Sequence, residues 1–105
     1  MIFELRTETP GMIKSFGNKE TEKVWKGYES RKFPPEIQNT ARRKLRMLHQ
    51  SHNINDLRSP PANHLEKLRG NFDPPLYSIR INDQWRVVFR WTGNDATEVE
   101  IMDYH

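Results

Sequence analysis

The chain ends in three consecutive side chains that can exchange protons, Asp103, Tyr104 and His105. An imidazole titrates at about pH 6.5 and can act as an acid or a base at neutral pH. Terminal residues usually fray, but Val99 and Ile101 of a predicted strand should anchor this terminus in the core. A carboxylate, a phenol and an imidazole together predict general acid–base catalysis, and a frayed terminus is the alternative.

Two arginines face each other across a predicted hairpin, Arg80 and Arg86. A three-residue loop, 82–84, brings the apolar residues of both strands onto one face, whereas a two-residue loop would place an arginine beside a core tryptophan. Like charges directly opposite each other destabilise a hairpin by up to about 1 kcal/mol. A phosphate bound between two guanidinium groups would instead make the pair stabilising. The pair predicts an anion site, unless both side chains extend into solvent or pair with Glu98 and Glu100.

Other catalytic motifs are missing from the sequence. His49, His52 and His64 lack the spacing of a metal site, and no Gly-rich phosphate loop or nucleophile elbow occurs. The chain has no Cys, which excludes a thiol nucleophile, a disulfide framework and an iron–sulfur cluster. We therefore expect neither a metal nor a cofactor, which leaves metal-free proton transfer beside a phosphate.

Two predicted helices precede most of the predicted strands. One helix is expected over 19–29, capped by Asn18, and a second over 36–50 after Pro34-Pro35. Strands are expected over residues 12–16, 64–68, 77–81, 85–91 and 97–102. Helices followed by a meander of strands are typical of an α+β fold.

Periodicity predicts which side chains these elements bury. The first helix is expected to bury Val24, Trp25 and Tyr28. The second helix has one apolar face, made of Ile37, Ala41, Leu45 and Leu48. The hairpin is expected to bury Ile79, Ile81, Trp85, Val87, Phe89 and Trp91.

The other side of the second predicted helix is basic, with Arg42, Arg43, Lys44 and Arg46. Residues 1–52 hold 11 Lys and Arg against 6 Asp and Glu, whereas residues 53–105 hold 6 against 8. A basic half favours polyanions such as nucleic acid, and an ordinary solvated surface is the alternative. The same helix could equally contact a protein partner.

The length and composition indicate a single domain. A chain of 105 residues has room for one core, and no apolar run exceeds three residues, far short of a membrane span. The absence of Cys fits a reducing compartment, so we expect a cytoplasmic protein with no membrane contact. Residues 1–11 end in Pro10-Gly11 before a second methionine, and we expect them to form a mobile extension to a domain over 12–105.

Five segments together resemble HigB-type toxins of the RelE/ParE superfamily: MIKSF at 12–16, DLRSPPAN at 56–63, LEKL at 65–68, SIRINDQWR at 78–86 and DYH at 103–105. The resemblance spans residues 12–105. It implies a RelE-like microbial-RNase fold, in which two N-terminal helices pack on a curved, mainly antiparallel sheet of about four to five strands.

The resemblance also implies a function, the toxin of a type II toxin–antitoxin system that inhibits translation. Such a toxin is a metal-independent endoribonuclease that cleaves mRNA on the ribosome. Its expected partners are mRNA, ribosomal RNA and a HigA-like antitoxin with a helix-turn-helix fold. The toxin would contact operator DNA only through this antitoxin. The hypothetical reaction is attack of a ribose 2′-OH on the adjacent phosphate, with Asp103 or His105 taking the proton and the other orienting or donating to the leaving oxygen.

By motif, the resemblance implies catalytic roles for Asp103, Tyr104, His105, Arg80 and Arg86. The arginines would stabilise the charge on the phosphorane, and Tyr104 would stack on a base or relay a proton. Some members carry a His and a Lys in the strand before the hairpin, where this chain has Glu66 and Arg69. The expected RNA-binding residues are His64, Lys67 and Arg69, with Arg42, Arg43 and Arg46 of the basic helix.

Two other functions fit the same residues. A ParE-like toxin of the same fold would act by binding a protein target such as gyrase, and a non-catalytic RNA-binding module would need no proton transfer. The Asp-Tyr-His terminus favours the nuclease over the protein-binding toxin.

Overall fold

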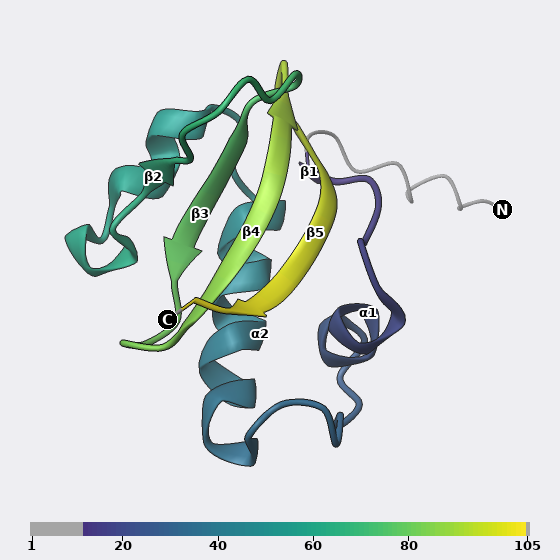
Figure 1. Cartoon of the computed structure of the whole chain (residues 1–105). Helices are drawn as coiled ribbons and strands as arrows, with labels where there is room; N and C mark the ends of the chain where they lie inside the picture. Colours follow the sequence, from purple (N-terminus) through teal and green to yellow (C-terminus); the bar gives the residue numbers. More distant parts are fainter. Residues whose placement is uncertain (1–11, 105) are drawn as a thin grey trace, which may run out of the picture.

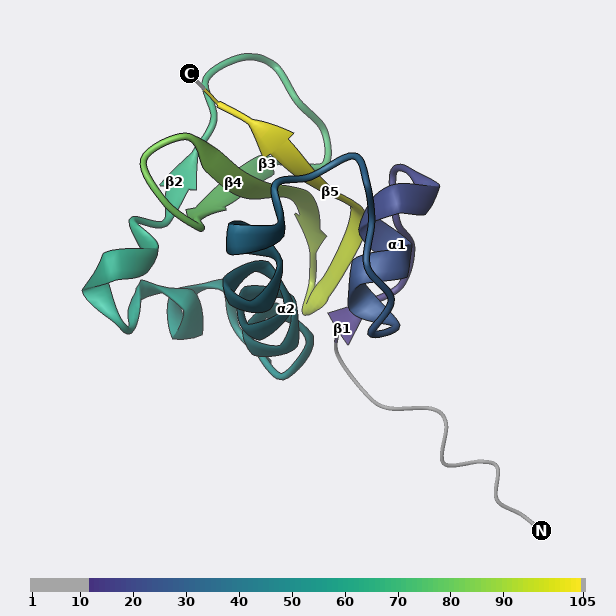
Figure 2. The ribbon, with the colours of Figure 1, turned by 90° about the horizontal axis from the view of Figure 1, so that it is seen from below.

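A computed structural model describes residues 12–104 as one five-stranded sheet with two helices on one of its faces (Figures 1 and 2). The strand order is β1-β5-β4-β3-β2, and every neighbouring pair is antiparallel except β1 and β5. The architecture is α+β, as predicted. The predicted extension over residues 1–11 and the candidate residue His105 lie outside the described residues.

Helix α1, Lys19–Trp25, begins as expected but ends earlier. The Asn18 side chain accepts a hydrogen bond from the Thr21 backbone N–H at 2.8 Å, which caps the helix. The predicted helix over 19–29 is too long because Gly27 adopts φ +94°, a left-handed conformation that ends a helix. The prediction that Tyr28 is buried is therefore wrong, since 65% of this residue is exposed.

Helix α2, Pro35–His49, packs against the sheet through its predicted apolar face. Proline is favourable at the first helical position because its missing N–H would be unpaired there in any residue. The four residues Ile37, Ala41, Leu45 and Leu48 are all buried. Among the described residues, no helix is long and apolar enough to cross a membrane.

Strands β3, Leu76–Arg80, β4, Trp85–Thr92, and β5, Asp95–Asp103, form the centre of the sheet. The register places Ile79 opposite Val87 and Arg80 opposite Arg86, which confirms the predicted three-residue loop. The hairpin's apolar side chains face the helices as predicted, with Trp85 only partly buried.

The two edge strands are much shorter than predicted. Strand β1, Met12–Ile13, replaces the strand expected over 12–16, and Phe16 makes only an isolated bridge to Val99. Strand β2, Glu66–Lys67, replaces the strand expected over 64–68. Here His64 is left-handed, with φ 44°, because it ends a short 3-10 helix.

Two 3-10 helices, η2, Ile54–Arg58, and η3, Pro61–Asn63, connect α2 to β2. The buried Asn63 holds them together: its Nδ2 donates to the Leu57 carbonyl at 3.0 Å, and its Oδ1 accepts from Lys44 Nζ at 2.6 Å. The connection is therefore fixed to α2 and delivers His64 and Glu66 to the edge of the sheet.

His49 joins the end of α2 to strand β1. Its Nδ1 accepts a hydrogen bond from the Ile13 N–H at 3.4 Å, and its ring lies against Trp25 with the ring centroids 4.9 Å apart. Burial lowers the pKa of His49, and the charge of Lys14 lowers it further. The fold therefore favours the neutral imidazole.

The free energy of unfolding should depend on pH through His49. Above its ordinary pKa of about 6.5 the imidazole is neutral in both states, so its contribution is constant. As the pH falls below that value, the unfolded chain takes up a proton that the folded chain resists, and stability is lost. Urea unfolding at about pH 7.5 and about pH 5.5 should show a smaller acid-induced loss for His49→Gln than for the exposed control His52→Gln. Equal losses in the two variants would contradict this role.

Candidate active site

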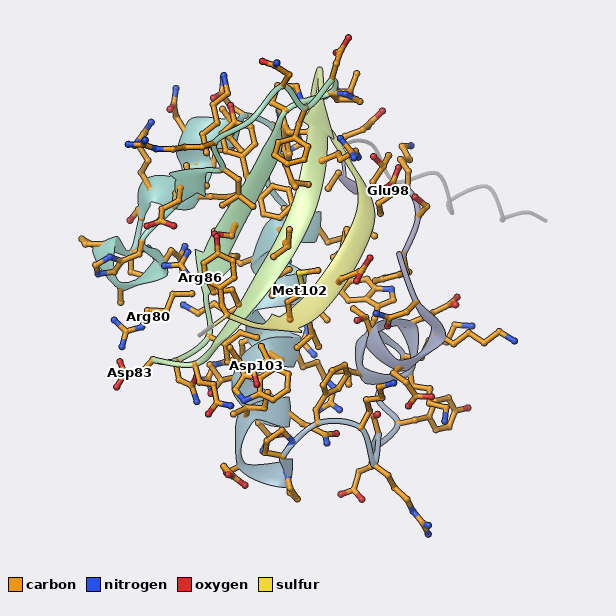
Figure 3. All side chains as sticks on the ribbon, viewed as in Figure 1. Arg80, Asp83, Arg86, Glu98, Met102 and Asp103 are labelled. Atoms are coloured by element: carbon orange, nitrogen blue, oxygen red, sulfur yellow. The ribbon has the colours of Figure 1, made fainter. Side chains whose placement is uncertain are left out.

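The sheet has one face that the helices do not cover, here called the open face (Figure 3). Residues that are paired across neighbouring antiparallel strands point to the same side of a sheet. Arg86 pairs with Arg80 on β3 and with Met102 on β5, so these three side chains share the open face. The structure thus brings both candidate arginines onto one surface.

Arg86 is held at the centre of the open face. Only 9% of this residue is exposed. Its Nη1 donates to Ser78 Oγ at 2.7 Å and to the His64 carbonyl at 3.2 Å, and it lies 3.6 Å from Glu66 Oε1. These contacts come from β2, β3 and the end of η3. A buried guanidinium in such a frame is fixed in direction, which suits an anion-binding group.

Tyr104 covers Arg86 from the C-terminal end of β5. The Cζ of Arg86 lies 5.4 Å from the centroid of the Tyr104 ring, within the range of a cation–π interaction. The Tyr104 N–H donates to the Gln84 carbonyl at 2.6 Å, which ties the residue to the hairpin loop. The fold therefore brings the C-terminal phenol against one of the two candidate arginines.

Each of the two opposed arginines lies near a carboxylate, although not near Glu98 or Glu100. Arg80 forms an ion pair with Asp83 in the hairpin loop, and Arg86 lies near Glu66. Glu98 instead pairs with Arg90 at 3.3 Å, and Glu100 accepts a hydrogen bond from Asn18. The expected alternative, in which Glu98 and Glu100 neutralise the arginines, is wrong because those carboxylates face other partners.

Asp103 lies on the other side of the sheet from Arg86 and Tyr104. Its register partner is Trp85, whose ring packs edge-on against Phe33 of the core, with the ring centroids 5.7 Å apart. The Asp103 Oδ2 accepts a hydrogen bond from Gln84 Nε2 at 3.0 Å. Figure 3 shows this residue at the end of β5, away from Arg86. The C-terminal residues are consecutive, but alternation along β5 separates Asp103 from Tyr104.

An open pocket of about 540 Å³ adjoins Tyr104 at the edge of the open face. Its lining residues come from β2, the segment that follows β2 and the C-terminal end: Glu66, Lys67, Leu68, Arg69, Phe72 and Tyr104. Lys67 and Arg69, predicted to bind RNA, therefore share a surface with Tyr104. His64 contributes its carbonyl to Arg86, as described above.

Sequence reasoning missed Ser78 and Phe72. Ser78 is fully buried and bonds Arg86, and the hairpin register places it on the same face as Arg80. That register was available from the sequence, and it could have identified the serine as a neighbour of the arginines. Phe72 lies two residues after Gly70, outside any strand or helix, and carries no periodic signal.

The basic side of α2 divides into anchored and exposed residues. Arg42 Nε donates to the Val24 carbonyl at 2.9 Å, which joins α2 to the end of α1. Lys44 bonds Asn63, and burial lowers the pKa of Lys44. Arg43 and Arg46 are exposed. The helix therefore presents fewer free cations than the sequence suggests.

Comparison with known proteins gives consistent matches. Residues 14–105 match the family described as RelE-like toxin of type II toxin-antitoxin system HigB. An uncharacterized protein of Haemophilus influenzae is 44% identical over 74 residues, which cover 70% of this chain and 71% of that protein. Toxin HigB-1 of Vibrio cholerae is 43% identical over 66 residues, which cover 63% of this chain and 68% of that toxin. The chain belongs to the HigB family of RelE-like toxins of type II toxin–antitoxin systems.

Proposed function

We propose that this toxin is a ribosome-dependent, metal-independent endoribonuclease that cleaves mRNA and thereby inhibits translation. The observation that carries the proposal is Arg86, which is buried in a frame of hydrogen bonds, covered by Tyr104 and accompanied by Glu66 on an open face. A fixed guanidinium of this kind stabilises charge that develops on a phosphate. The proposed domain is residues 12–105, acting in the cytoplasm where translation takes place.

The proposed reaction is an internal transesterification of RNA. The ribose 2′-oxygen loses its proton and bonds to the adjacent phosphorus, and the bond from phosphorus to the 5′-oxygen breaks. The products are a 2′,3′-cyclic phosphate and a 5′-hydroxyl. Arg86, assisted by Arg80, stabilises the negative charge on the phosphorane oxygens.

We assign the proton acceptor to Glu66 rather than to Asp103. The Glu66 carboxylate lies 3.6 Å from Arg86 Nη1, so a phosphate bound at Arg86 would bring the neighbouring 2′-OH toward Glu66. Asp103 accepts from the Gln84 side chain, and the Gln84 carbonyl accepts from the Tyr104 N–H, so Asp103 acts as a positioning residue for Tyr104. His105, by its chemistry, is our proposed donor of a proton to the leaving 5′-oxygen.

Several cations are proposed to hold the RNA without reading its sequence. Lys67 and Arg69 line the pocket beside Tyr104, and Arg43 and Arg46 are exposed on α2. Backbone phosphates of mRNA and ribosomal RNA are the matching partners for such charges. His64 and Arg42 are proposed to have supporting roles, because the His64 carbonyl and the Arg42 side chain make hydrogen bonds that hold the fold.

A type II toxin acts together with an antitoxin. We propose that this antitoxin is HigA-like, with a helix-turn-helix fold, and that the complex reaches operator DNA only through it. The open face and the exposed part of α2 are the surfaces that such a partner would have to cover to stop the proposed reaction.

The experiment that tests the function maps mRNA 5′ ends after brief induction of the full chain, with a reporter mRNA that has or lacks its start codon. We expect discrete cuts in the translated reporter and none in the untranslated one. Equal cutting of both reporters would contradict ribosome dependence. Growth arrest without new RNA ends would overturn the nuclease in favour of a toxin that binds a protein target.

A further inference from the structure

Two partly exposed aromatic rings line the same pocket, Phe72 and Tyr104. Phe72 is 40% exposed and Tyr104 is 39% exposed, so part of each ring is open to solvent. They come from different parts of the chain, one from the segment between β2 and β3 and the other from the residue that follows β5. Two such rings beside one pocket provide surfaces on which a planar ring can stack.

An arginine supports each ring. The Cζ of Arg86 lies 5.4 Å from the centroid of Tyr104, and the Cζ of Arg90 lies 5.8 Å from the centroid of Phe72. Arg90 is itself fixed, because its Nη1 donates to the Pro74 carbonyl at 3.0 Å and its Nε lies 3.3 Å from Glu98 Oε1. A cation on one side of a ring leaves the opposite side for a stacked ligand.

The backbone next to Phe72 is adapted to this position of the ring. Gly70 has φ +126°, and a Cβ at that position would lie 2.8 Å from Phe72 Cε2. The backbone angle favours a glycine, and any larger residue would push the Phe72 ring aside. The turn after β2 therefore places Phe72 at the pocket instead of burying it in the core.

We propose that this pocket is a nucleobase subsite, in which Phe72 stacks on a base of the RNA adjacent to the phosphate at Arg86. The inference rests on the proposed function and extends it to a residue that has no assigned role. A volume of about 540 Å³ is within the range of small-molecule sites, and Lys67 and Arg69 on its lining suit the backbone phosphates of the same nucleotide. Stacking accepts any base because every base has a π-face.

The test is a titration of the full chain, followed by NMR, with two probes: a nucleoside 3′-monophosphate and ribose 5-phosphate, which lacks a base. We expect the base protons of the nucleotide to shift upfield, and Phe72→Ala to weaken nucleotide binding roughly 10-fold or more. Binding of ribose 5-phosphate should not change in that variant. Phe72→Trp should keep the nucleotide affinity, and Tyr28→Ala, which alters another exposed aromatic, is the matched control.

Two results would overturn the subsite. The first is that the chemical shifts of the base protons stay unchanged when the nucleotide binds. The second is that Phe72→Ala weakens the binding of both probes equally, which would make the ring merely structural. Gly70→Ala is a second variant, which displaces the Phe72 ring without removing it. It should weaken the binding of the nucleotide but not that of ribose 5-phosphate. Cleavage of the translated reporter is measured separately, so a chain that stacks a base but cuts no RNA would refute the nuclease and retain the subsite.

Discussion

Arg86→Ala should lower the rate of RNA cleavage by about 10²–10³, the loss that follows removal of one fixed donor to a developing anionic charge. The guanidinium is nearly buried and held by Ser78 and the His64 carbonyl, so water cannot replace it in the same direction. Arg86→Lys should recover only part of the rate, because an ammonium group lacks the planar fork. The readout is the frequency of cuts in the translated reporter at equal levels of toxin.

The matched control for Arg86 is Arg80→Ala. Arg80 pairs with the exposed Asp83, so its loss removes a less constrained charge and should cost less in rate. Thermal unfolding of both variants separates catalysis from stability, since Arg86→Ala also leaves the Ser78 hydroxyl without its partner. A variant that is folded, lacks Arg86 and still cuts at the wild-type rate would remove this residue from the site.

Glu66→Gln should lower the cleavage rate by about 10²–10⁴, which is the usual contribution of a positioned general base. The amide keeps the size of the side chain but cannot accept the 2′-proton. Asp103→Asn is the matched control because it changes a carboxylate on the opposite side of the sheet and should have the smaller effect. Both variants are compared in the same reporter assay.

The reverse order of effects would refute the assignment. If Asp103→Asn abolished cleavage while Glu66→Gln left it unchanged, the proton acceptor would be at the C-terminus, as the resemblance implied. Glu66→Gln also removes a charge beside Arg86, so affinity for ribose 5-phosphate is measured in parallel. A change in that affinity alone, with the cleavage step intact, would give Glu66 an electrostatic role and overturn its role as a base.

The sequence predicted the centre of the fold better than its edges. The apolar face of α2 and the register of the β3–β4 hairpin follow from local periodicity, and both are present. The end of α1 depends on a single left-handed residue, Gly27, whose conformation no periodicity reveals. The short strand β2 likewise depends on the long connection before it, whose shape is fixed by contacts of Asn63 with α2.

The candidate site was only partly accessible from the sequence. Arg80 and Arg86 could be paired because the hairpin is local. The approach of Glu66 to Arg86 depends on how β2 is added to the sheet, and that is decided by tertiary packing. The separation of Asp103 from Tyr104, in contrast, follows from the alternation of side chains along a strand. The same alternation predicted the register of the hairpin, so this separation could also have been predicted from the sequence.

The shortness of both edge strands has a consequence for the behaviour of the free toxin. Within the described part of the chain, β1 and β2 contain two residues each, so each edge strand presents few unpaired backbone groups. Long, flat edges serve as templates for pairing between copies of a chain and for aggregation. The described edge strands of a toxin that has lost its antitoxin therefore offer little backbone for edge-to-edge pairing between copies of the chain.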